Sequence, residues 1–345
     1  MENLNFSDKD TTFVSNKNIS KIEPLSNVNS HRTLFAKAAL SVLLGSACNS
    51  GSVELYGDND SEERREDVVD TGVEDTGFMN VEDVPNQWAW DSEGEAGVSK
   101  GEVLWESFPD TELSGVVFHK GLNSYFVVSD EGGLFQLDRG GNVVSNWGMN
   151  GDLEGLALDE DSDTLFVANE EGSVLNLWDL VDNNFVPEAY CSLNVPVDGN
   201  AGLEAITFVA NGDAPVSWGN DPLGFIVAGT QASLELFVFP VGDCEGGNEI
   251  DSVSLDSPLL TSRDDVSGLD YNATVDQLYV LHDDGNKLDV MGMEGDIRKT
   301  YDLPGGDHEG VFLRSVSCTR DIGTLLVVED GGFISEWSDF PTVCR

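Results

Sequence analysis

The sequence predicts an all-β fold, a single β-propeller of five blades. Three observations carry this prediction. From about residue 112 onward the chain repeats a unit of roughly forty residues. Each unit holds short runs of aromatic and β-branched residues that favour strands, and no long stretch has helical periodicity. Glycine, aspartate and asparagine separate the runs. About four strands in each repeat are typical of propeller blades.

Five tripeptides open the units and supply the first strand of each blade. In each, an apolar residue or a histidine is followed by serine or glutamate and then by glycine or alanine. The openings are Leu113–Gly115, Leu153–Gly155, Leu203–Ala205, Val266–Gly268 and His308–Gly310. A short apolar run follows each of them, which predicts a strand that begins at the opening.

Two further runs in each unit predict the second and third strands. The second runs lie at 125–128, 165–167, 224–227, 278–281 and 325–328. The third runs follow a turn and lie at 134–137, 174–177, 234–237, 288–290 and 333–335. The long interval between the third and fourth openings leaves six blades as the alternative. We interpret 211–223 and 244–248 as loop insertions within this interval and therefore expect five.

The last unit lacks a clear fourth strand after Trp337. The segment Glu102–Phe108 lies just before the first blade and has the composition of a strand. We expect this N-terminal segment to complete the last blade. The ring would then be closed by strands from both ends of the chain, which also covers free sheet edges.

The residues before the propeller predict an exported lipoprotein. Residues 1–47 are typical of a signal peptide with an extended n-region, because basic residues precede a short apolar run that ends in small residues. Leu44–Cys48 resembles a bacterial lipobox, which implies a lipid on Cys48. Residues 48–99 are acidic and polar and predict a disordered tether. The propeller domain is then 100–345. We expect an envelope protein at the outer membrane that faces the periplasm or the cell surface.

The charge of the chain restricts its partners. It holds 64 acidic and 17 basic residues, with a formal net charge of -47. Because nucleic-acid binding requires a basic surface, this composition excludes nucleic acid. It favours metal cations or basic partners, while solvation or adaptation to high salt would explain it equally. We expect a monomer that is held at the membrane by its lipid and binds a protein or a small molecule.

Four cysteines follow Cys48, and an even number in an exported chain predicts two disulfides. Their number alone allows three pairings. Cys318 follows the first strand of the last blade and Cys344 follows its third strand, so both lie on the same face of the propeller. We therefore expect these two to pair. Cys191 and Cys244 would then join the second and third blades.

The openings, together with the turns that follow them, resemble the SdiA-regulated, YjiK-like family. The turns in question are Ser129–Asp138, Asn169–Leu177 and His282–Leu288. The resemblance covers about residues 111–338. It implies a bacterial envelope β-propeller, often linked to calcium, and some members have been discussed as phytase-like. The third blade departs from the pattern, because Ala205 stands where the other openings have glycine and its loops are longer.

The openings also supply the candidate metal ligands. First strands line the axis of a propeller, and their N-terminal ends meet at one face, which we call the top face. Ser114, Glu154, Glu204, Ser267 and Glu309 occupy equivalent positions there. Three carboxylates so close together repel one another and are costly to bury unpaired. Calcium suits hard oxygen ligands from several strands, so we expect Glu154, Glu204 and Glu309 to bind it. The alternative is that each glutamate accepts backbone N–H groups from a neighbouring blade.

Turns between the second and third strands return to the top face, because adjacent strands are antiparallel. In four of them an acidic pair precedes glycine: Asp130–Gly132, Glu170–Gly172, Asp283–Gly285 and Glu329–Gly331. Hairpin geometry favours Asp-Gly and explains much of this pattern. Together the pairs still predict an acidic top face.

Two classes of function follow from these observations. The first is a calcium-binding propeller that serves as a binding, sensing or interaction module in the envelope. The second is a metal-dependent hydrolase that uses the channel metal, either a lactonase or esterase or a phytase-like enzyme. In a lactonase-like site, His282 or His308 would act as a base. The few, scattered basic residues argue against a phytate substrate. Further contacts are expected at the channel mouth from Ser114, Ser267, His282, Asp283 and His308.

Overall fold

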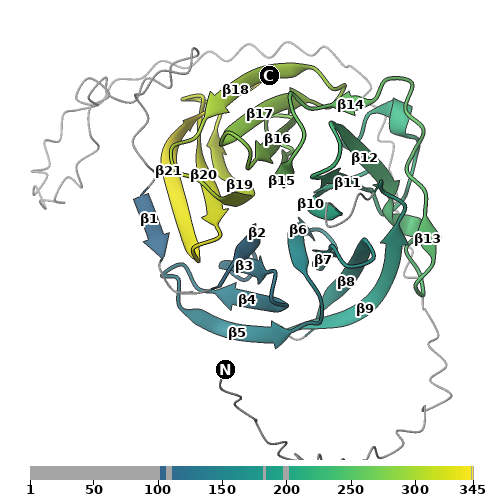
Figure 1. Cartoon of the computed structure of the whole chain (residues 1–345), viewed down its shortest axis with the longest axis horizontal. Coiled ribbons are helices and arrows are strands. Elements are labelled where there is room, and N and C mark those ends of the chain that lie inside the picture. The colour runs from purple at the N-terminus through teal and green to yellow at the C-terminus, as the bar shows by residue number, and fades with distance from the viewer. Residues whose placement is uncertain (1–101, 106–110, 182–183, 197–201, 343, 345) are drawn as a thin grey trace, which may run out of the picture. The chain divides into compact units, whose positions relative to one another are not determined.

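The computed structural model describes residues 102–105, 111–181, 184–196, 202–342 and 344. The predicted signal peptide, the lipidation at Cys48 and the acidic tether lie outside these residues. The described chain forms five sheets arranged around a common axis, as Figure 1 shows. The prediction of an all-β propeller with five blades is confirmed. No helix in the described segments is long and apolar enough to span a membrane.

The four strands of each blade pair antiparallel, and the first of them lies nearest the axis (Figure 1). Blade one comprises β2 (Leu113–His119), β3 (Ser124–Ser129), β4 (Gly133–Leu137) and β5 (Val143–Gly148). Blade two comprises β6 (Leu153–Asp159), β7 (Thr164–Asn169), β8 (Val174–Val181) and β9 (Asn184–Leu193). Blade three comprises β10 (Leu203–Val209), β11 (Phe225–Thr230), β12 (Glu235–Pro240) and β14 (Leu259–Leu260). Blade four comprises β15 (Val266–Asn272), β16 (Gln277–His282), β17 (Lys287–Gly292) and β18 (Ile297–Asp302).

The fifth blade combines strands from distant parts of the chain. It comprises β19 (His308–Ser317), β20 (Ile322–Glu329), β21 (Phe333–Pro341) and, on its outer edge, β1 (Glu102–Trp105). The pairing of β1 with β21 is antiparallel. All five inner strands begin at the residue where the corresponding opening begins in the sequence.

The long interval in the third unit forms loops instead of a sixth blade within the described chain. Two short 3-10 turns lie in it, η2 (Val216–Trp218) and η3 (Val241–Asp243). A short strand, β13 (Glu249–Ile250), leaves blade three and pairs in parallel with β9 of blade two. The insertion therefore ties two neighbouring blades together at their outer edge.

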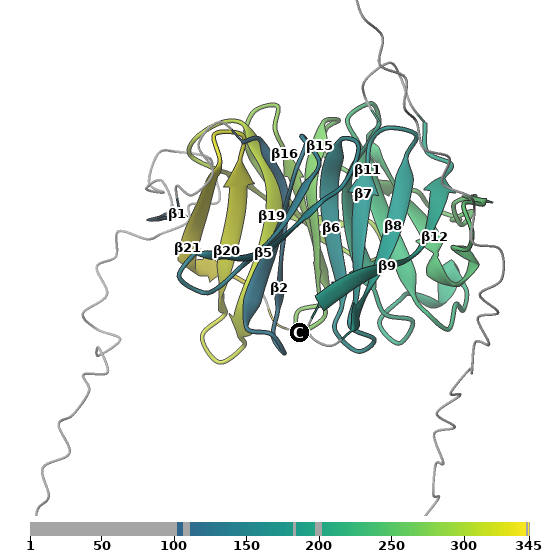
Figure 2. The same cartoon turned by 90° about the horizontal axis from the view of Figure 1, so that it is seen from below.

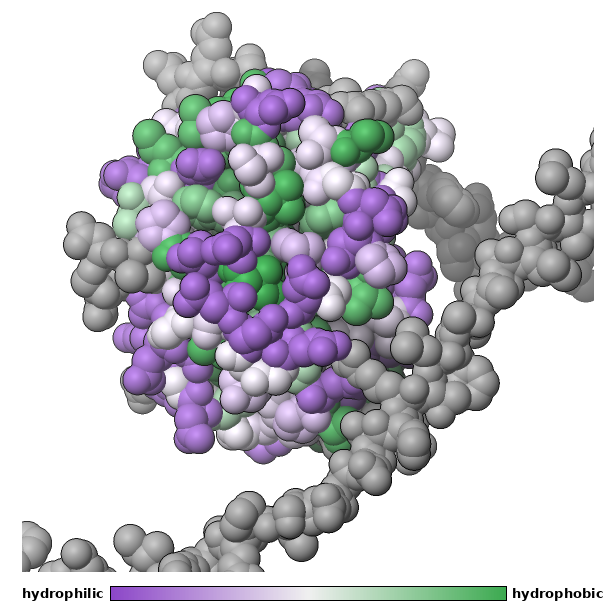
Figure 3. All heavy atoms as spheres, turned by 90° about the vertical axis from the view of Figure 1, so that its right-hand side faces the viewer, coloured by the Kyte–Doolittle hydropathy of each residue, from purple (hydrophilic) through white to green (hydrophobic). Residues whose placement is uncertain are grey.

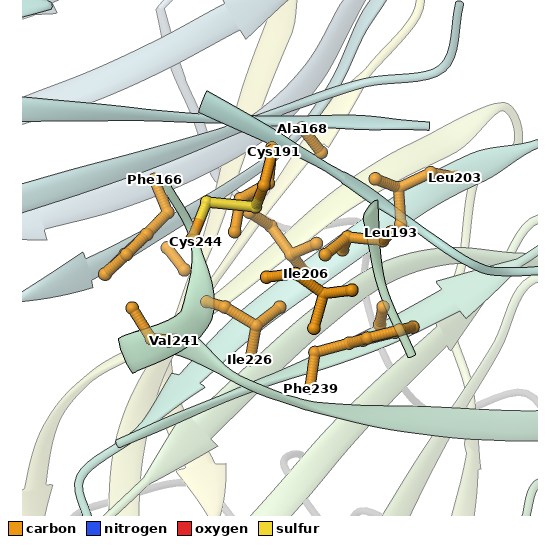
Figure 4. Close-up of a cluster of buried hydrophobic side chains, with 14 of the residues drawn as sticks. Phe166, Ala168, Cys191, Leu193, Leu203, Ile206, Ile226, Phe239, Val241 and Cys244 are labelled. Atoms are coloured by element: carbon orange, nitrogen blue, oxygen red, sulfur yellow. A yellow bond between two sulfur atoms is a disulfide. The ribbon is translucent and has the colours of Figure 1, made fainter. Parts of the chain in front are cut away.

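The hydrophobic core is divided among the interfaces between blades. Each of five buried clusters contains residues from two adjacent blades. The cluster between blades two and three, drawn in Figure 4, contains Phe166, Ile206 and Phe239. Figure 2 shows the inner strands running from one face of the ring to the other. On the outer side seen in Figure 3, hydrophobic residues are scattered among hydrophilic ones.

Both predicted disulfides are present. Cys191 bonds to Cys244 and Cys318 bonds to Cys344. Cys191 and Cys244 are buried in the cluster between blades two and three (Figure 4), so this bond joins the two blades as expected. The second disulfide fastens the end of the described chain to the loop after β19.

The inner strands approach one another so closely that side chains are excluded at the axis. The openings of four blades carry glycine at this point: Gly115, Gly155, Gly268 and Gly310. A Cβ atom added to Gly310 would lie 2.8 Å from the carbonyl oxygen of Ser114 and 2.9 Å from Cα of Gly115. These atoms belong to the backbone of the next blade, which cannot yield as a flexible side chain would. The glycine is therefore a requirement of ring closure.

Replacing Gly310 with alanine should destabilise the ring by about 1–3 kcal/mol, the usual cost of overpacking. The matched control is Gly148→Ala in β5, because a Cβ there would meet nothing within 4 Å. This control should change stability by less than about 0.5 kcal/mol. Chemical denaturation of both variants measures the difference. Equal stabilities would contradict the close approach at the axis.

Candidate metal centre on the top face

A β-bulge at each opening positions the candidate ligands. In blade one, Leu113 pairs with Ser129 and Gly115 pairs with Val128, which leaves Ser114 as the extra residue. The same shift in register occurs in blades three, four and five, at Glu204, Ser267 and Glu309. In blade two it falls between Leu153 and Leu156, a stretch that contains Glu154. Because a bulge bends the strand and re-aims a side chain, the repeated bulge explains why these residues converge at the axis.

The three glutamates interact electrostatically with one another. Burial, followed by the charges of Glu204, Asp152 and Glu309, raises the pKa of Glu154 to about 10. Burial and then the carboxylate of Glu170 raise the pKa of Glu204 to about 9, to which Glu309 and Asp152 also contribute. Without a cation, both carboxyl groups would therefore be protonated at neutral pH.

Three carboxylates in blade two form the tightest group. Asp152, Glu154 and Glu170 each offer one oxygen, and these oxygens all lie within 4.8 Å of one another. Asp152 precedes β6, Glu154 is at its bulge, and Glu170 is the first acid of the turn between β7 and β8. This spacing allows one cation to contact all three residues.

Backbone contacts fix two of these carboxylates side by side. The N–H of Glu170 donates to the carbonyl of Asp152 at 2.8 Å. The amide of Asn169 donates to the carbonyl of Asn150 at 2.9 Å and accepts the N–H of Glu171 at 2.9 Å. Gly151 lies between these segments with a φ of 100°, a conformation that favours glycine. The loop before β6 is thus locked against the acidic turn.

Glu204 extends this group toward blade three. Its side chain hydrogen bonds to Glu170, and the residue is only 5% exposed. Yet its Oε1 atom is buried without a hydrogen-bond partner. An unpartnered carboxylate oxygen in the interior is costly, and a cation is the partner that removes this cost.

Glu309 lies among a second set of acids. Burial raises its pKa to about 8, with further contributions from Asp330 and Asp283, and then from Asp265 and Asp307. Burial followed by the charges of Glu112 and Asp307 raises the pKa of Asp330 to about 6. The acidic surface therefore continues from blade two around to blades four and five.

Acids in the turns hold neighbouring blades together. Glu170 in blade two accepts the N–H of Gly202, at the opening of blade three, at 3.0 Å. Asp283 in blade four accepts the N–H of His308, at the opening of blade five, at 3.2 Å. A contact of this kind, in which a carboxylate accepts a backbone N–H of the next blade, was considered for the opening glutamates. Here the acids of the turns make it.

The first acid of the turn in blade one is also affected by its neighbours. Burial and a hydrogen bond to Glu112 raise the pKa of Asp130 to about 8.

The two serines among the openings also face the axis. Ser114 and Ser267 line a narrow channel together with Glu154. Its volume is about 10 Å³, which accommodates about one water molecule. The hydroxyl of Ser267 donates to the carbonyl of His308 at 2.7 Å. A hydrated cation is too large for this channel, so a metal would bind at its mouth.

The two histidines considered as bases are both fully buried. One nitrogen of His282 contacts the carbonyl oxygen of Asp264 at 3.1 Å, and the other lies 3.3 Å from a carboxylate oxygen of Asp289. Burial alone would raise the pKa of Asp289, but hydrogen bonds from His282, Ser262 and Thr300 lower it to about 2. His282 is therefore part of a buried polar network that connects β16 with β17.

Sequence reasoning selected Glu154, Glu204 and Glu309 and omitted Asp152. It assigned Glu170 to turn geometry. The structure brings Asp152 and Glu170 to Glu154, while the carboxylates that raise the pKa of Glu309 belong to blades four and five. The signal available for Asp152 was its closeness in the chain to Glu154, from which it is separated by one residue.

These features define the class of protein: a five-bladed β-propeller with a cluster of partly buried carboxylates at the top of its axis. The chain belongs to the SdiA-regulated family, whose model matches residues 107–311. A comparison with curated proteins finds no match.

Two solved structures are similar in architecture. Glutaminyl cyclase from Myxococcus xanthus is 14% identical with a TM-score of 0.47, and the alignment covers 69% of this chain and 92% of that chain. The β-propeller domain of Cps50 (Swd1) from Myceliophteria thermophila is 15% identical with a TM-score of 0.36, over 64% and 63% of the two chains. At these values neither similarity bears on function.

The acidic cluster predicts a distinct pH dependence when calcium is removed by chelator. Burial places the pKa of Glu154, Glu204 and Glu309 at about 10, 9 and 8, above the ordinary 4.5. Because the folded values are raised, their contribution to stability is complete below the ordinary value. It is lost progressively as the pH rises above that value, until the pH has passed the folded values of 8 to 10. The melting temperature of the chelated protein should therefore fall between about pH 6 and about pH 9.

Glu204→Gln is the control for this titration, because glutamine does not ionise. The fall in melting temperature should be smaller in this variant than in the wild-type chain. A wild-type melting temperature that stays constant or rises over the same range would contradict the assignment.

Proposed function

We propose that this chain is a calcium-binding β-propeller of the cell envelope that serves as a binding or sensing module. The ion would lie at the mouth of the channel, with oxygens from Asp152, Glu154, Glu170 and Glu204. One observation carries the proposal: Glu204 is 5% exposed, and its Oε1 atom has no hydrogen-bond partner beside three converging carboxylates. A divalent cation supplies that partner and neutralises the repulsion among the group.

The chemistry of the ligands favours calcium over other divalent ions. The group consists of carboxylates only, and calcium takes six to eight oxygen ligands in flexible geometry. Zinc prefers cysteine and histidine, which the group lacks. Magnesium requires a near-ideal octahedron and usually retains several waters. Side chains from a bulge, a loop and a turn form an irregular arrangement that suits calcium better.

The bound ion would act first on the ring itself. Glu154 belongs to blade two and Glu204 to blade three, so one cation bridges two inner strands. Only the folded ring brings these ligands together, so binding would stabilise the folded state. Waters in the remaining coordination positions would make the top face receptive to an oxygen-bearing group on a partner.

The hydrolase alternative gains no support from the described residues. For a lactonase or esterase, His282 or His308 was expected to act as a base beside the channel metal. His282 and His308 are both fully buried, and the ring of His282 contacts Asp264 and Asp289. We therefore propose binding rather than hydrolysis.

The envelope location rests on the sequence before the propeller. A lipid on Cys48 would anchor the domain at the membrane, and the acidic segment 48–99 would hold it away from the lipid surface. Replacing Cys48 with serine should release the protein from the membrane fraction. Unchanged retention of this variant would contradict the anchor.

Calcium should raise the melting temperature of the chain with increasing concentration, and chelator should reverse the rise. At a hundredfold excess over the dissociation constant, one site contributes about 2.7 kcal/mol. Glu204→Gln should remove most of the response, because glutamine keeps the shape of the side chain but not its charge. Calorimetry with and without calcium measures the effect.

Glu131→Gln is the matched control. Glu131 is exposed in the turn between β3 and β4, and its variant should keep the full calcium response. If the wild-type melting temperature ignores calcium after exhaustive chelation, the acids serve only to hold the blades and the proposal is wrong. An equal loss of response in both variants would contradict the assigned ligands.

A further inference from the structure

The opposite face of the ring, where the inner strands end, holds a large cavity. Its volume is about 590 Å³, within the range of small-molecule sites. The ends of β2, β6, β10, β15 and β19 and the loops that follow the first four of them line it. We propose that this cavity binds an organic cation, an ammonium group carried on an apolar or aromatic body. The site is separate from the proposed metal centre and does not depend on it.

Aromatic side chains supply the apolar part of the site. Phe118, Phe208, Tyr271 and Phe312 line the cavity, and each is half-buried, so part of every ring remains accessible. The first three come four residues after the bulged residue of their own strands, which places equivalent rings around the axis. Phe208 is held in place by stacking on Phe166 of the neighbouring blade at 5.4 Å. Aromatic faces of this kind attract cations.

One carboxylate lies within this apolar wall. Asp270 of β15 lines the cavity and is 7% exposed. One of its oxygens accepts the N–H of Leu313 at 2.9 Å, which fixes the side chain between blades four and five. Burial raises the pKa of Asp270 to about 7. A cationic partner in the cavity would favour its ionised form.

The cations that line the cavity are already paired. Lys120 lies 2.7 Å from a carboxylate oxygen of Glu160, and Arg314 lies 2.9 Å from one of Glu336. Arg314 also lies over the ring of Tyr125. Three further acids line the rim, and the lining residues include no further base to pair with them. These acids are Asp159, Asp161 and Asp213. The cavity therefore attracts positive and repels negative ligands.

The inserted loop of blade three contributes to this rim. Ala210 and Asp213 lie at its beginning and line the cavity. Between blades three and four, the hydroxyl oxygen of Thr207 accepts the N–H of Tyr271 at 2.8 Å. Contacts of this kind hold the wall in one arrangement before a ligand enters. A preformed site loses less ordering entropy when it binds.

The test uses three probes that share a phenylethyl body and differ in their polar group, on the purified full chain in the presence of chelator. Phenethylamine is a cation at neutral pH, 2-phenylethanol is neutral, and 3-phenylpropionate is an anion. Isothermal titration should show phenethylamine binding at least about tenfold more tightly than the alcohol, the effect of a charged hydrogen bond. The carboxylate should not bind. Equal affinity for the three probes, tighter binding of the anion, or no binding of phenethylamine would overturn the proposal.

Variants locate the site. Asp270→Asn keeps an acceptor for the N–H of Leu313 but lacks the charge, so it should bind phenethylamine no better than the alcohol. Phe208→Leu should weaken phenethylamine severalfold by removing one aromatic face. Asp339→Asn, at an exposed position in β21, is the matched control and should bind normally.

Phenethylamine binding that is unaffected in both Asp270→Asn and Phe208→Leu would overturn the assignment of the cavity. The calcium response of Asp270→Asn should equal that of the wild-type chain, because the two sites lie on opposite faces. A failure of calcium binding would therefore leave this result unchanged.

Discussion

The close approach of the inner strands at the axis is the constraint on which the rest of the structure depends. Five strands converge there, and four of them carry glycine where the backbone of the next blade lies about 3 Å from the position of a Cβ. Directly before each glycine, a β-bulge turns one side chain toward the top of the axis. Packing thus excludes side chains at the glycine of each opening. The serine or glutamate before it points its side chain toward the top of the axis instead.

The convergence of these side chains at the top of the axis has an electrostatic consequence. Where the bulged residue is serine, as at Ser114 and Ser267, a hydroxyl lines the narrow channel at little cost. Where it is glutamate, burial and neighbouring acids raise the pKa far above its ordinary value. Blade two adds Asp152 and Glu170 to the same position, so the repulsion is strongest there. The proposed calcium ion would turn this unfavourable grouping into a link between two blades.

Much of the fold could be predicted from the sequence because its repeats are local. Each opening, such as Leu203–Ala205, combines a strand signal with a small residue, and each inner strand begins there. The disulfides also followed from strand order, since Cys318 and Cys344 come after strands that run in the same direction. These predictions needed only the order of strands and the alternation of their directions.

The parts that could not be predicted depend on contacts between units. The pairing of Asp152 with Glu170 requires the backbone bond that joins them. The sequence did not predict that Phe118, Phe208 and Tyr271 line a cavity, because aromatic residues in a strand are equally typical of a packed core. The packing of neighbouring blades decides how much of each aromatic side chain remains accessible.

The central claim is that a calcium ion completes the carboxylate cluster at the top of the axis. Crystals of the full chain grown with calcium test it most directly, through anomalous difference density. We expect a peak at about 2.3–2.6 Å, the usual calcium–oxygen distance, from oxygens of the proposed ligands Asp152, Glu154, Glu170 and Glu204. Density confined to other parts of the chain, with the carboxyl groups of Glu154, Glu170 and Glu204 hydrogen bonded to one another, would contradict the claim.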